Sequence, residues 1–449
     1  MTTAGLLDMM RLLVLIVVFI VPTITDARQY PAHPADYRSQ LKKLQAGDQL
    51  LLSPGIYTQG LPIHHLKGRA DAPIVITGPT EGPHAVLIAR PGHNTISILD
   101  SRYVVIRHLE LDGRGLPVDG VKCEGHAAWA HHITLEHLLI QRHNHNQQTV
   151  AISTKCPTWN WIIRHNVIKH AGTGLYLGNS DGRAPFIAGL IEHNLVTDTL
   201  GYNLQIKHQR ERPVIDGMPL QDQVTIIRHN VFARASQNQD RAMARPNVLV
   251  GHWPLSGHGQ NDRYLIYGNF FYENSQEALF QGEGNIALYN NLFVNHQGNA
   301  VRIQPHHDIP REIHIFFNTV LANGAGIDLA NPNDPTPFSQ WITNNVIFAR
   351  KLPTDAITIQ NNFVQILEAA SRYLTQPFSP PGQMNLIPIR QAMDQKKINI
   401  GLVKDYPEWY LDFDGQWNDD RFGAYAYARL PNWLPRLEKK PDIPDNNKR

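Results

Sequence analysis

The chain has 449 residues, of which 42% are hydrophobic and 18% are charged, so it can bury a large core. Its 41 basic and 39 acidic residues give a formal net charge of +2. This balance argues against a nucleic-acid-binding protein, which would carry a basic stripe. The 23 histidines would make the surface more cationic on mild acidification, which favours acidic partners.

An apolar run, LLVLIVVFIV at residues 12–21, lies directly behind Arg11 near the N-terminus. The run is too short for a comfortable membrane span and has the layout of a secretory signal. We therefore predict a signal peptide over residues 1–27, a secreted or periplasmic protein, and no stable membrane span after signal removal. An uncleaved anchor is the alternative interpretation.

The segment that follows predicts a short helix at about 37–44, a strand after Gly47-Asp48, a turn at Ser53-Pro54-Gly55 and a strand at 72–77. We expect this segment to cap the open end of a repeat structure, since such an end exposes unpaired strand edges.

A short phrase of apolar and β-branched residues around an Asn then recurs along the chain, as in IIRHNVI, IIRHNVF and ALYNNLF. The recurring positions are Asn166, Asn194, Asn230, Asn269, Asn291, Asn318, Asn345 and Asn362, with His108 and His137 in the equivalent place. The spacing is that of one supersecondary unit per repeat, and the composition indicates strands. Stacked units bury an apolar side that one unit cannot. The sequence thus predicts an all-β, single-domain, right-handed parallel β-helix over 28–366, with its coils at roughly 74–366.

The repeated Asn has a structural interpretation. Its side-chain amide can bond to the Asn above and below it, satisfies turn backbone and tolerates left-handed geometry. We therefore expect a ladder of amides at one bend of the coil, without a chemical role.

Strand alternation predicts which residues of a following strand face inward. The apolar inward set is Val121, Cys123, Val150, Ile152, Leu175, Leu177, Leu204, Ile206, Val248, Val250, Val301, Ile303, Ile327 and Leu329. The outward row is then Lys122, Glu124, Ser153, Lys155, Tyr176, Gln205, Lys207, His252, Gln281, Glu283, Arg302, Gln304 and Asp328. Two long insertions, at 208–222 and 236–262, leave the coil from the middle of this row, where binding loops are expected.

An outward row that mixes cations, amides and an aromatic side chain suits a long acidic sugar chain. Lys207 and Arg302 are the best-placed cations. The expected substrate-binding residues are Tyr176, Gln205, His208, Arg210, Gln281, Glu283, Gln304 and His306. Ordinary polar surface is the alternative interpretation of the same row.

The two cysteines, Cys123 and Cys156, lie one repeat apart. They could pair in an oxidising compartment or fill the apolar interior.

Beyond residue 366 the repeat ends. Residues 366–374 and 389–396 are expected to be helical, and 401–434 is rich in Trp, Tyr and Asp. We predict that 367–449 is an irregular extension packed on the β-helix, with a mobile tail from about 435.

Two sequence stretches carry a family resemblance. AGDQLLLSPGIY with DAPIVITGP near the start, and DFDGQWNDDRFGAYAY at 412–427, resemble segments of the family six polysaccharide lyases, which include chondroitinase B and alginate lyases. The resemblance implies a Lys base, an assisting Arg one coil later, and a calcium ion held by acidic residues. Lys207 matches the Lys, whereas Gly251 and His252 stand in place of the Arg, and Asn203 and Gln205 in place of the acids.

We predict that the protein is a monomer that acts on an acidic, uronate-containing polysaccharide by β-elimination or C5-epimerisation. Both reactions need a neutralised carboxylate and a base for the C5 proton. Lys207 is the expected base, His252 an acid or base, and Arg302 or Arg210 the neutralising cation. The alternative is a non-catalytic glycan-binding surface or matrix protein.

Two further short motifs give weaker indications of function. Gly257-His258-Gly259 is similar to a polygalacturonase motif, but the paired upstream Asp residues are absent. His306-His307-Asp308 could bind a metal, although a polar turn is the preferred interpretation and no metal site is predicted.

Overall fold

The computed structural model describes residues 27–234, 243–330, 337–351, 358–389, 399–417, 422–426 and 431–443. Nearly all of the predicted signal peptide lies outside these ranges. Within them, no helix has the length and apolar character that a membrane crossing requires.

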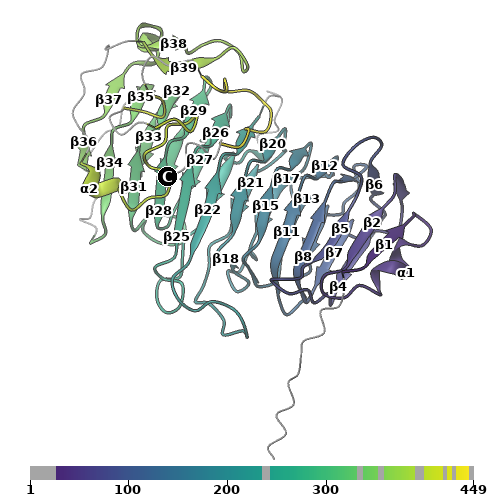
Figure 1. Ribbon diagram of the computed structural model, residues 1–449. Helices are drawn as coiled ribbons and strands as arrows, with labels where there is room; N and C mark the ends of the chain where they lie inside the picture. The colour runs from purple at the N-terminus through teal and green to yellow at the C-terminus, as the bar shows by residue number, and fades with distance from the viewer. Residues whose placement is uncertain are drawn as a thin grey trace, which may run out of the picture.

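Three long parallel sheets, here called A, B and C, form the body of the protein (Figure 1). Sheet A contains β1 (Gln29–Ala32), β2 (Gln49–Leu52), β5 (Ile74–Thr77), β8 (Ser101–Arg107), β11 (Ala130–Glu136), β15 (Ile162–Arg164), β19 (Leu190–Glu192), β22 (Val224–Arg228), β25 (Arg263–Tyr267), β28 (Ile286–Tyr289), β31 (Ile313–Phe316), β34 (Gln340–Thr343) and β36 (Thr358–Gln360), with β14 (Thr158–Trp159) and β18 (Phe186–Ile187) attached beside β11. Sheet B contains β3 (Gly55–Tyr57), β6 (Ala85–Ile88), β9 (Leu109–Asp112), β12 (Leu139–Gln141), β16 (Val167–Lys169), β20 (Leu195–Thr197), β23 (Val231–Ala233), β26 (Phe270–Tyr272), β29 (Leu292–Asn295), β32 (Thr319–Ala325), β35 (Val346–Lys351) and β37 (Phe363–Gln365). Sheet C contains β4 (Leu61–His64), β7 (Ile96–Leu99), β10 (Val121–Cys123), β13 (Val150–Thr154), β17 (Thr173–Leu177), β21 (Leu204–Ile206), β24 (Val248–Val250), β27 (Phe280–Gly282), β30 (Val301–Ile303) and β33 (Ile327–Leu329).

The chain visits the three sheets in turn, so each coil contributes one strand to each sheet, and every strand pairs in parallel with its counterpart one coil away. The predicted right-handed parallel β-helix is confirmed. Its start differs from the prediction, because β1 and β2 already pair in register with β5 in sheet A. Coiling therefore begins near residue 29 rather than 74, and most of the expected cap is itself coil.

The true cap at the N-terminal end is the short helix α1 (Tyr37–Leu41), which ends earlier than expected. Tyr37 and Leu41 are buried, and the Tyr37 hydroxyl donates to the Gly60 carbonyl at 2.6 Å. These contacts cover the open end of the first coil, which would otherwise expose its interior and its strand edges.

The interior of the coil is apolar along its whole length, as strand alternation predicts. Inward residues of sheet C, such as Val121, Ile152, Leu175 and Leu204, have no exposed surface. Cys123 belongs to the same row and forms a disulfide with Cys156, with the two Cα atoms 6.0 Å apart. The disulfide settles the alternative that the sequence left open, since the two buried cysteines are bonded rather than free.

The predicted Asn ladder is present at the bend between sheets A and B. From Asn166 to Asn345, each side-chain amide donates to the amide oxygen of the next Asn at 2.9–3.0 Å, and Asn362 is the last acceptor. Each backbone N–H in the row from Asn166 to Asn345 also donates to that oxygen. The ladder satisfies buried polar groups that no water reaches, which supports the structural interpretation.

His108 and His137 do not occupy the ladder position. They stack with His165, His193 and His229 in a separate column, with ring centroids 4.9–5.1 Å apart. All five have a positive φ of 53–55°. The bend therefore places its left-handed residue one position before the ladder Asn, and His is among the residues that tolerate that conformation.

The C-terminal extension covers the outer faces of sheets A and B in the later coils (Figure 1). Outward apolar residues of sheet B, such as Val231, Phe270 and Leu292, pack against Leu386, Phe413 and other residues of the extension, which includes η2 (Leu367–Arg372), β38 (Leu374–Gln376) and β39 (Asn385–Pro388). On sheet A, Val403 from α2 (Ile400–Val403) joins an aromatic cluster. The helix predicted at 366–374 is this 3₁₀ helix, whereas 389–396 lies almost wholly outside the described residues.

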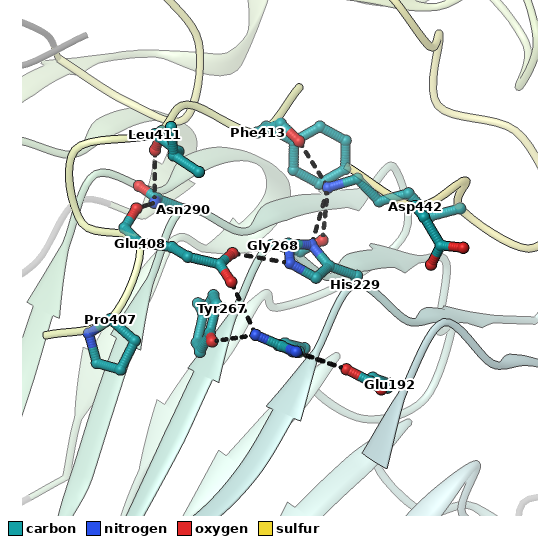
Figure 2. A network of polar contacts seen from close by, with 12 residues as sticks. Glu192, His229, Tyr267, Gly268, Asn290, Pro407, Glu408, Leu411, Phe413 and Asp442 are labelled. Atoms are coloured by element: carbon teal, nitrogen blue, oxygen red, sulfur yellow. Dashed lines mark hydrogen bonds and ion pairs between the residues drawn. The ribbon is translucent and has the colours of Figure 1, made fainter. Parts of the chain in front are cut away.

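The last described segment is held by a buried charge network (Figure 2). Lys440 Nζ donates to the carbonyl oxygens of Phe413 at 2.6 Å and Gly268 at 3.1 Å, and only 3% of the residue is exposed. Nearby, Glu408 accepts from Arg228 and His229. Residues 435–443 of the tail that was predicted to be mobile thus contact the coil through the buried Lys440 ammonium, and residues 444–449 lie outside the described residues.

Candidate functional site

Sheet C carries a row of mostly polar residues on its outer face. The strand register aligns Lys122, Ser153, Tyr176, Gln205, Leu249, Gln281, Arg302 and Asp328 across neighbouring strands. Because the repeat fixes which residues alternate outward, the sequence identified this row, with one exception described below.

Lys155 and Lys207 form part of a second outer row, two residues beyond the first. Lys155 follows β13, and Lys207 follows β21, so the two lysines flank the intervening strand β17. Gly178 stands between them with φ +85°, and a Cβ there would lie 3.5 Å from that of Lys207. The glycine therefore leaves open the space between the two lysine side chains.

A cavity of about 460 Å³ opens over β10, β13, β17 and β21; we call it the first cavity. Four cations line it, namely Lys122, Lys155, Lys207 and Arg245. Asp119 is the one acidic side chain among its described lining residues, and it is paired with Lys122 at 3.1 Å. The first cavity therefore carries an excess of positive charge, which suits an anionic ligand.

The aromatic side chain of Tyr176 lines the same cavity and lies close to two of these cations. Lys155 Nζ lies 3.3 Å from the ring centroid and Lys207 Nζ lies 5.9 Å from it, within the range of cation–π attraction. Burial raises the pKa of Tyr176, so its phenol stays protonated and can donate a hydrogen bond or a proton. Burial similarly raises the pKa of Tyr202, on the same wall, against the opposing charge of Arg245.

Burial has the opposite effect on the two lysines, because it disfavours their charged form. It lowers the pKa of Lys155 to about 8, with the charge of Asp119 partly opposing it. It also lowers the pKa of Lys207, against the charge of Glu283. Among the described residues, neither ammonium has a carboxylate within ion-pair distance. Lysines of this kind are candidates for proton abstraction.

A second cavity, of about 270 Å³, continues the groove over β21, β24, β27 and β30. It shares Tyr202, Gln205, Lys207 and Arg245 with the first cavity, so the two are parts of one groove. Its further lining residues include His208, Glu277, Gln281, Glu283, Gln304, His306 and His307. The structure thus brings together eight predicted residues, namely Tyr176, Gln205, Lys207, His208, Gln281, Glu283, Gln304 and His306.

Within the second cavity, Glu283 is almost fully buried, with 3% exposed, although the sequence placed it on the outward row. It accepts hydrogen bonds from the backbone N–H of His307 at 2.8 Å and from His307 Nδ1 at 3.0 Å. The His307 ring stacks on His208 at a centroid distance of 3.7 Å. Burial lowers the pKa of His208 to about 4, and the neighbouring His307 and Lys207 add to the effect.

His252 does not belong to the outward row. The register puts Leu249 there, and Gly251 lies at the end of β24 next to Lys207 and His208. The His252 ring is 2% exposed, and its nitrogens lie 2.5 and 3.0 Å from the carbonyl oxygens of Trp253 and Ile309. The loop after β24 therefore buries a side chain that the sequence placed in the groove.

Arg302 and Arg210 also lie away from Lys207. Arg302 is on the outward row, three strands from β21, which is about 14 Å at the usual strand spacing. Its Nε lies 3.9 Å from an Asp328 carboxylate oxygen. Arg210 lines a third cavity of about 290 Å³, beside His252 and on the other side of the His208–His307 pair. The expected trio of Lys207, His252 and Arg302 does not converge.

The calcium implied by the lyase resemblance does not fit the residues present. Asn203 is buried and its amide donates to Thr199 Oγ1 and the Ala233 carbonyl, while Gln205 offers a neutral amide. In the described part of the chain, no group of three or more His, Cys, Asp or Glu side chains is arranged to hold a metal ion. His307 of the His306-His307-Asp308 motif instead binds Glu283, and His258 Nδ1 lies 3.1 Å from the Leu220 carbonyl oxygen.

The site residues expected from the sequence did not include four residues that now define the groove: Lys155, Lys122, Arg245 and Tyr202. Lys122 and Lys155 were on the predicted outward row, so their position was available as a signal. Arg245 comes from the 236–262 insertion, which the sequence identified only as a loop. Tyr202 lies in a bend before β21 and carries no periodic signal.

Comparisons with known proteins find similarity in fold only. No family model and no curated protein matches the chain. A lacto-N-biosidase from Eubacterium ramulus is 14% identical, with a TM-score of 0.51, covering 76% of this chain and 68% of its own. An alginate lyase from Paenibacillus sp. str. FPU-7 is 15% identical, with a TM-score of 0.46, and the match covers 75% of this chain and 99% of the lyase. A mannuronic acid specific polysaccharide family 6 lyase from human gut microbiota is 12% identical, with a TM-score of 0.44, and the match covers 77% of this chain and 84% of that lyase.

Proposed function

We propose that the protein binds an acidic, uronate-containing polysaccharide in the groove of sheet C and acts on it by β-elimination or C5-epimerisation. The observation that carries this proposal is the first cavity, where Lys155 and Lys207 lie at the ring of Tyr176, Arg245 lines the wall, and the one acidic lining residue, Asp119, is already paired with Lys122. Cations neutralise uronate carboxylates, and an aromatic ring packs on a sugar face.

Both reactions begin with removal of the C5 proton of a uronate. Lys207 is the proposed base, because burial lowers its pKa and so increases the fraction of neutral amine above that of an exposed lysine. Lys155 and Arg245 are the proposed neutralising groups for the carboxylate, in place of Arg302. The phenol of Tyr176 stays protonated, because burial raises its pKa, and can donate a hydrogen bond to the bound sugar.

We further infer that the protein works outside the cytoplasm. The Cys123–Cys156 disulfide supports this, since such bonds persist mainly in oxidising compartments. The apolar run at 12–21 supports export independently.

The proposal is tested by incubating the protein with alginate, pectate and glycosaminoglycans. A lyase generates an unsaturated sugar that raises the ultraviolet absorbance, whereas an epimerase changes only the uronate NMR spectrum. Binding without either change would establish the alternative, a non-catalytic glycan-binding protein. Absence of both binding and turnover on all acidic polysaccharides would overturn the proposal.

The base is tested with Lys207→Met, which should lower kcat by roughly 10²- to 10⁴-fold, the usual contribution of a general base. Lys169→Met is the matched control, because Lys169 lies on β16 in sheet B and does not line the groove. The control should keep full activity. Equal rates for the two variants would exclude Lys207 as the base.

A further inference from the structure

We propose that His307, oriented by the buried carboxylate of Glu283, is the general acid that works opposite Lys207 in this groove. The inference deepens the proposed function and rests on it. It assigns a proton-transferring role to a residue that the outward-row pattern did not select, and a positioning role to Glu283.

The hydrogen bond between His307 and Glu283 has a direction that the chemistry of the two groups fixes. An ionised carboxylate only accepts, so the 3.0 Å contact requires His307 Nδ1 to carry a hydrogen and donate it to Glu283. This leaves Nε2 as the ring atom available for proton exchange. A carboxylate that fixes the imidazole tautomer and stabilises its protonated form is the arrangement expected around an acid–base histidine.

Lys207 and His307 line the same cavity, although they come from different coils. His208 directly follows Lys207 and stacks on the His307 ring at 3.7 Å, which holds His307 against the end of β21. His307 retains 33% side-chain exposure, whereas Glu283 retains 3%. The histidine is thus accessible to a ligand, and its carboxylate partner is not.

The charges around His307 act in both directions. Glu283 favours its imidazolium form, while neighbouring cationic groups disfavour it. The titratable or charged groups near it are Glu283, His208, His306, Lys207, Arg210 and Asp308. Among the residues that the structure describes, Glu283 is the one group that contacts the His307 ring through a hydrogen bond, so removing its charge should have the largest effect on the ring.

In β-elimination, the neutral Lys207 amine takes the C5 proton, and the C5–H electron pair forms the C4–C5 double bond as the C4–O4 bond breaks. The departing O4 takes the proton from His307 Nε2. Lys207 ends as an ammonium and His307 as a neutral imidazole, so one proton returns from Lys207 to His307 through water before the next turnover. No electrons are gained or lost.

A simpler interpretation is that Glu283 only anchors the turn after β30, since it also accepts the backbone N–H of His307. The first experiment separates these roles without any substrate. The variant Glu283→Gln keeps an amide oxygen for that N–H but removes the charge. In ¹⁵N-histidine NMR, with His307→Asn used for assignment, the wild-type ring should carry its hydrogen on Nδ1, and Glu283→Gln should shift the tautomer populations toward hydrogen on Nε2.

The control for this measurement is Glu124→Gln, because Glu124 follows β10 and accepts from Asn94, away from His307. It should leave the His307 tautomer populations unchanged. Identical His307 tautomer populations in wild type and Glu283→Gln would overturn the positioning role of Glu283.

The second experiment uses the substrate on which the wild type is active. His307→Asn should lower kcat by about 10²-fold with little change in KM, and Glu283→Gln should shift the alkaline limb of the pH–rate profile to lower pH. If the wild type is active and His307→Asn keeps its kcat, this inference fails while the proposed function stands. If the wild type acts on no acidic polysaccharide, the proposed function fails, and the acid role of His307 with it.

Discussion

The buried Lys440 and the half-buried Lys155 both have a pKa lowered by burial to about 8, yet they lie in opposite kinds of surroundings. Lys440 donates to two backbone carbonyls, and its charge is offset by Asp414, Glu408 and Asp412. Lys155 lies against the Tyr176 ring at the wall of an open cavity, with no carboxylate within ion-pair distance among the described residues.

The difference shows why a shifted pKa alone does not mark a functional residue. Around Lys440 the protein supplies every partner, so the ammonium joins the C-terminal segment to the coil. Around Lys155 and Lys207, the described part of the protein places no carboxylate within ion-pair distance. Lysines without such a partner are suited to binding an anionic ligand. Three substitutions test this contrast, in order of decreasing expected effect.

The largest effect is expected from Lys440→Met. Removing one member of a buried charge network leaves its carboxylates uncompensated, so the free energy of unfolding should fall by about 3 kcal/mol or more. Urea denaturation followed by circular dichroism at pH 7 measures it. Lys439→Met is the control, because Lys439 makes a single hydrogen bond to the His165 carbonyl and should cost about 1 kcal/mol. Similar losses for both variants would contradict a structural role for the Lys440 charge.

An intermediate effect is expected from Lys155→Met, on ligand binding rather than on folding. Affinity for an acidic oligosaccharide should fall by about tenfold, near 1.4 kcal/mol, as one desolvated cation is lost. In the wild type, affinity should weaken as pH rises through about 8, because Lys155 then loses its proton. Calorimetric titrations at several pH values check both points. If Lys155→Met keeps the wild-type pH dependence of affinity, a group other than Lys155 causes that dependence.

The smallest effect is expected from Lys122→Met. Lys122 lines the same cavity but is already paired with Asp119 at 3.1 Å, so its charge is largely compensated within the protein. The affinity for the same oligosaccharide should change by about two- to threefold at most, as for a weak surface pair. A loss as large as that of Lys155→Met would break the proposed distinction between paired and unpaired lysines.

The candidate site could be predicted from the sequence only in part. Residues such as Tyr176, Gln205 and Lys207 were found because their position follows from strand alternation within each coil. His252 was misplaced because it follows a strand end, where alternation no longer applies and the loop after β24 buries it. His307 and Glu283 are 24 residues apart and meet only through coil stacking, so neither residue indicated the pair by itself.

The sequence by itself determined the β-helix, the Asn ladder and the line of residues that faces outward on sheet C, because these depend on a local pattern repeated from coil to coil. Tertiary structure decided which outward residues become a site. The C-terminal extension covers the apolar outer faces of sheets A and B and carries Lys440 into a buried network. The insertions and the stacking of distant coils then bring Arg245, Glu283 and His307 to the groove, through contacts that no local periodicity specifies.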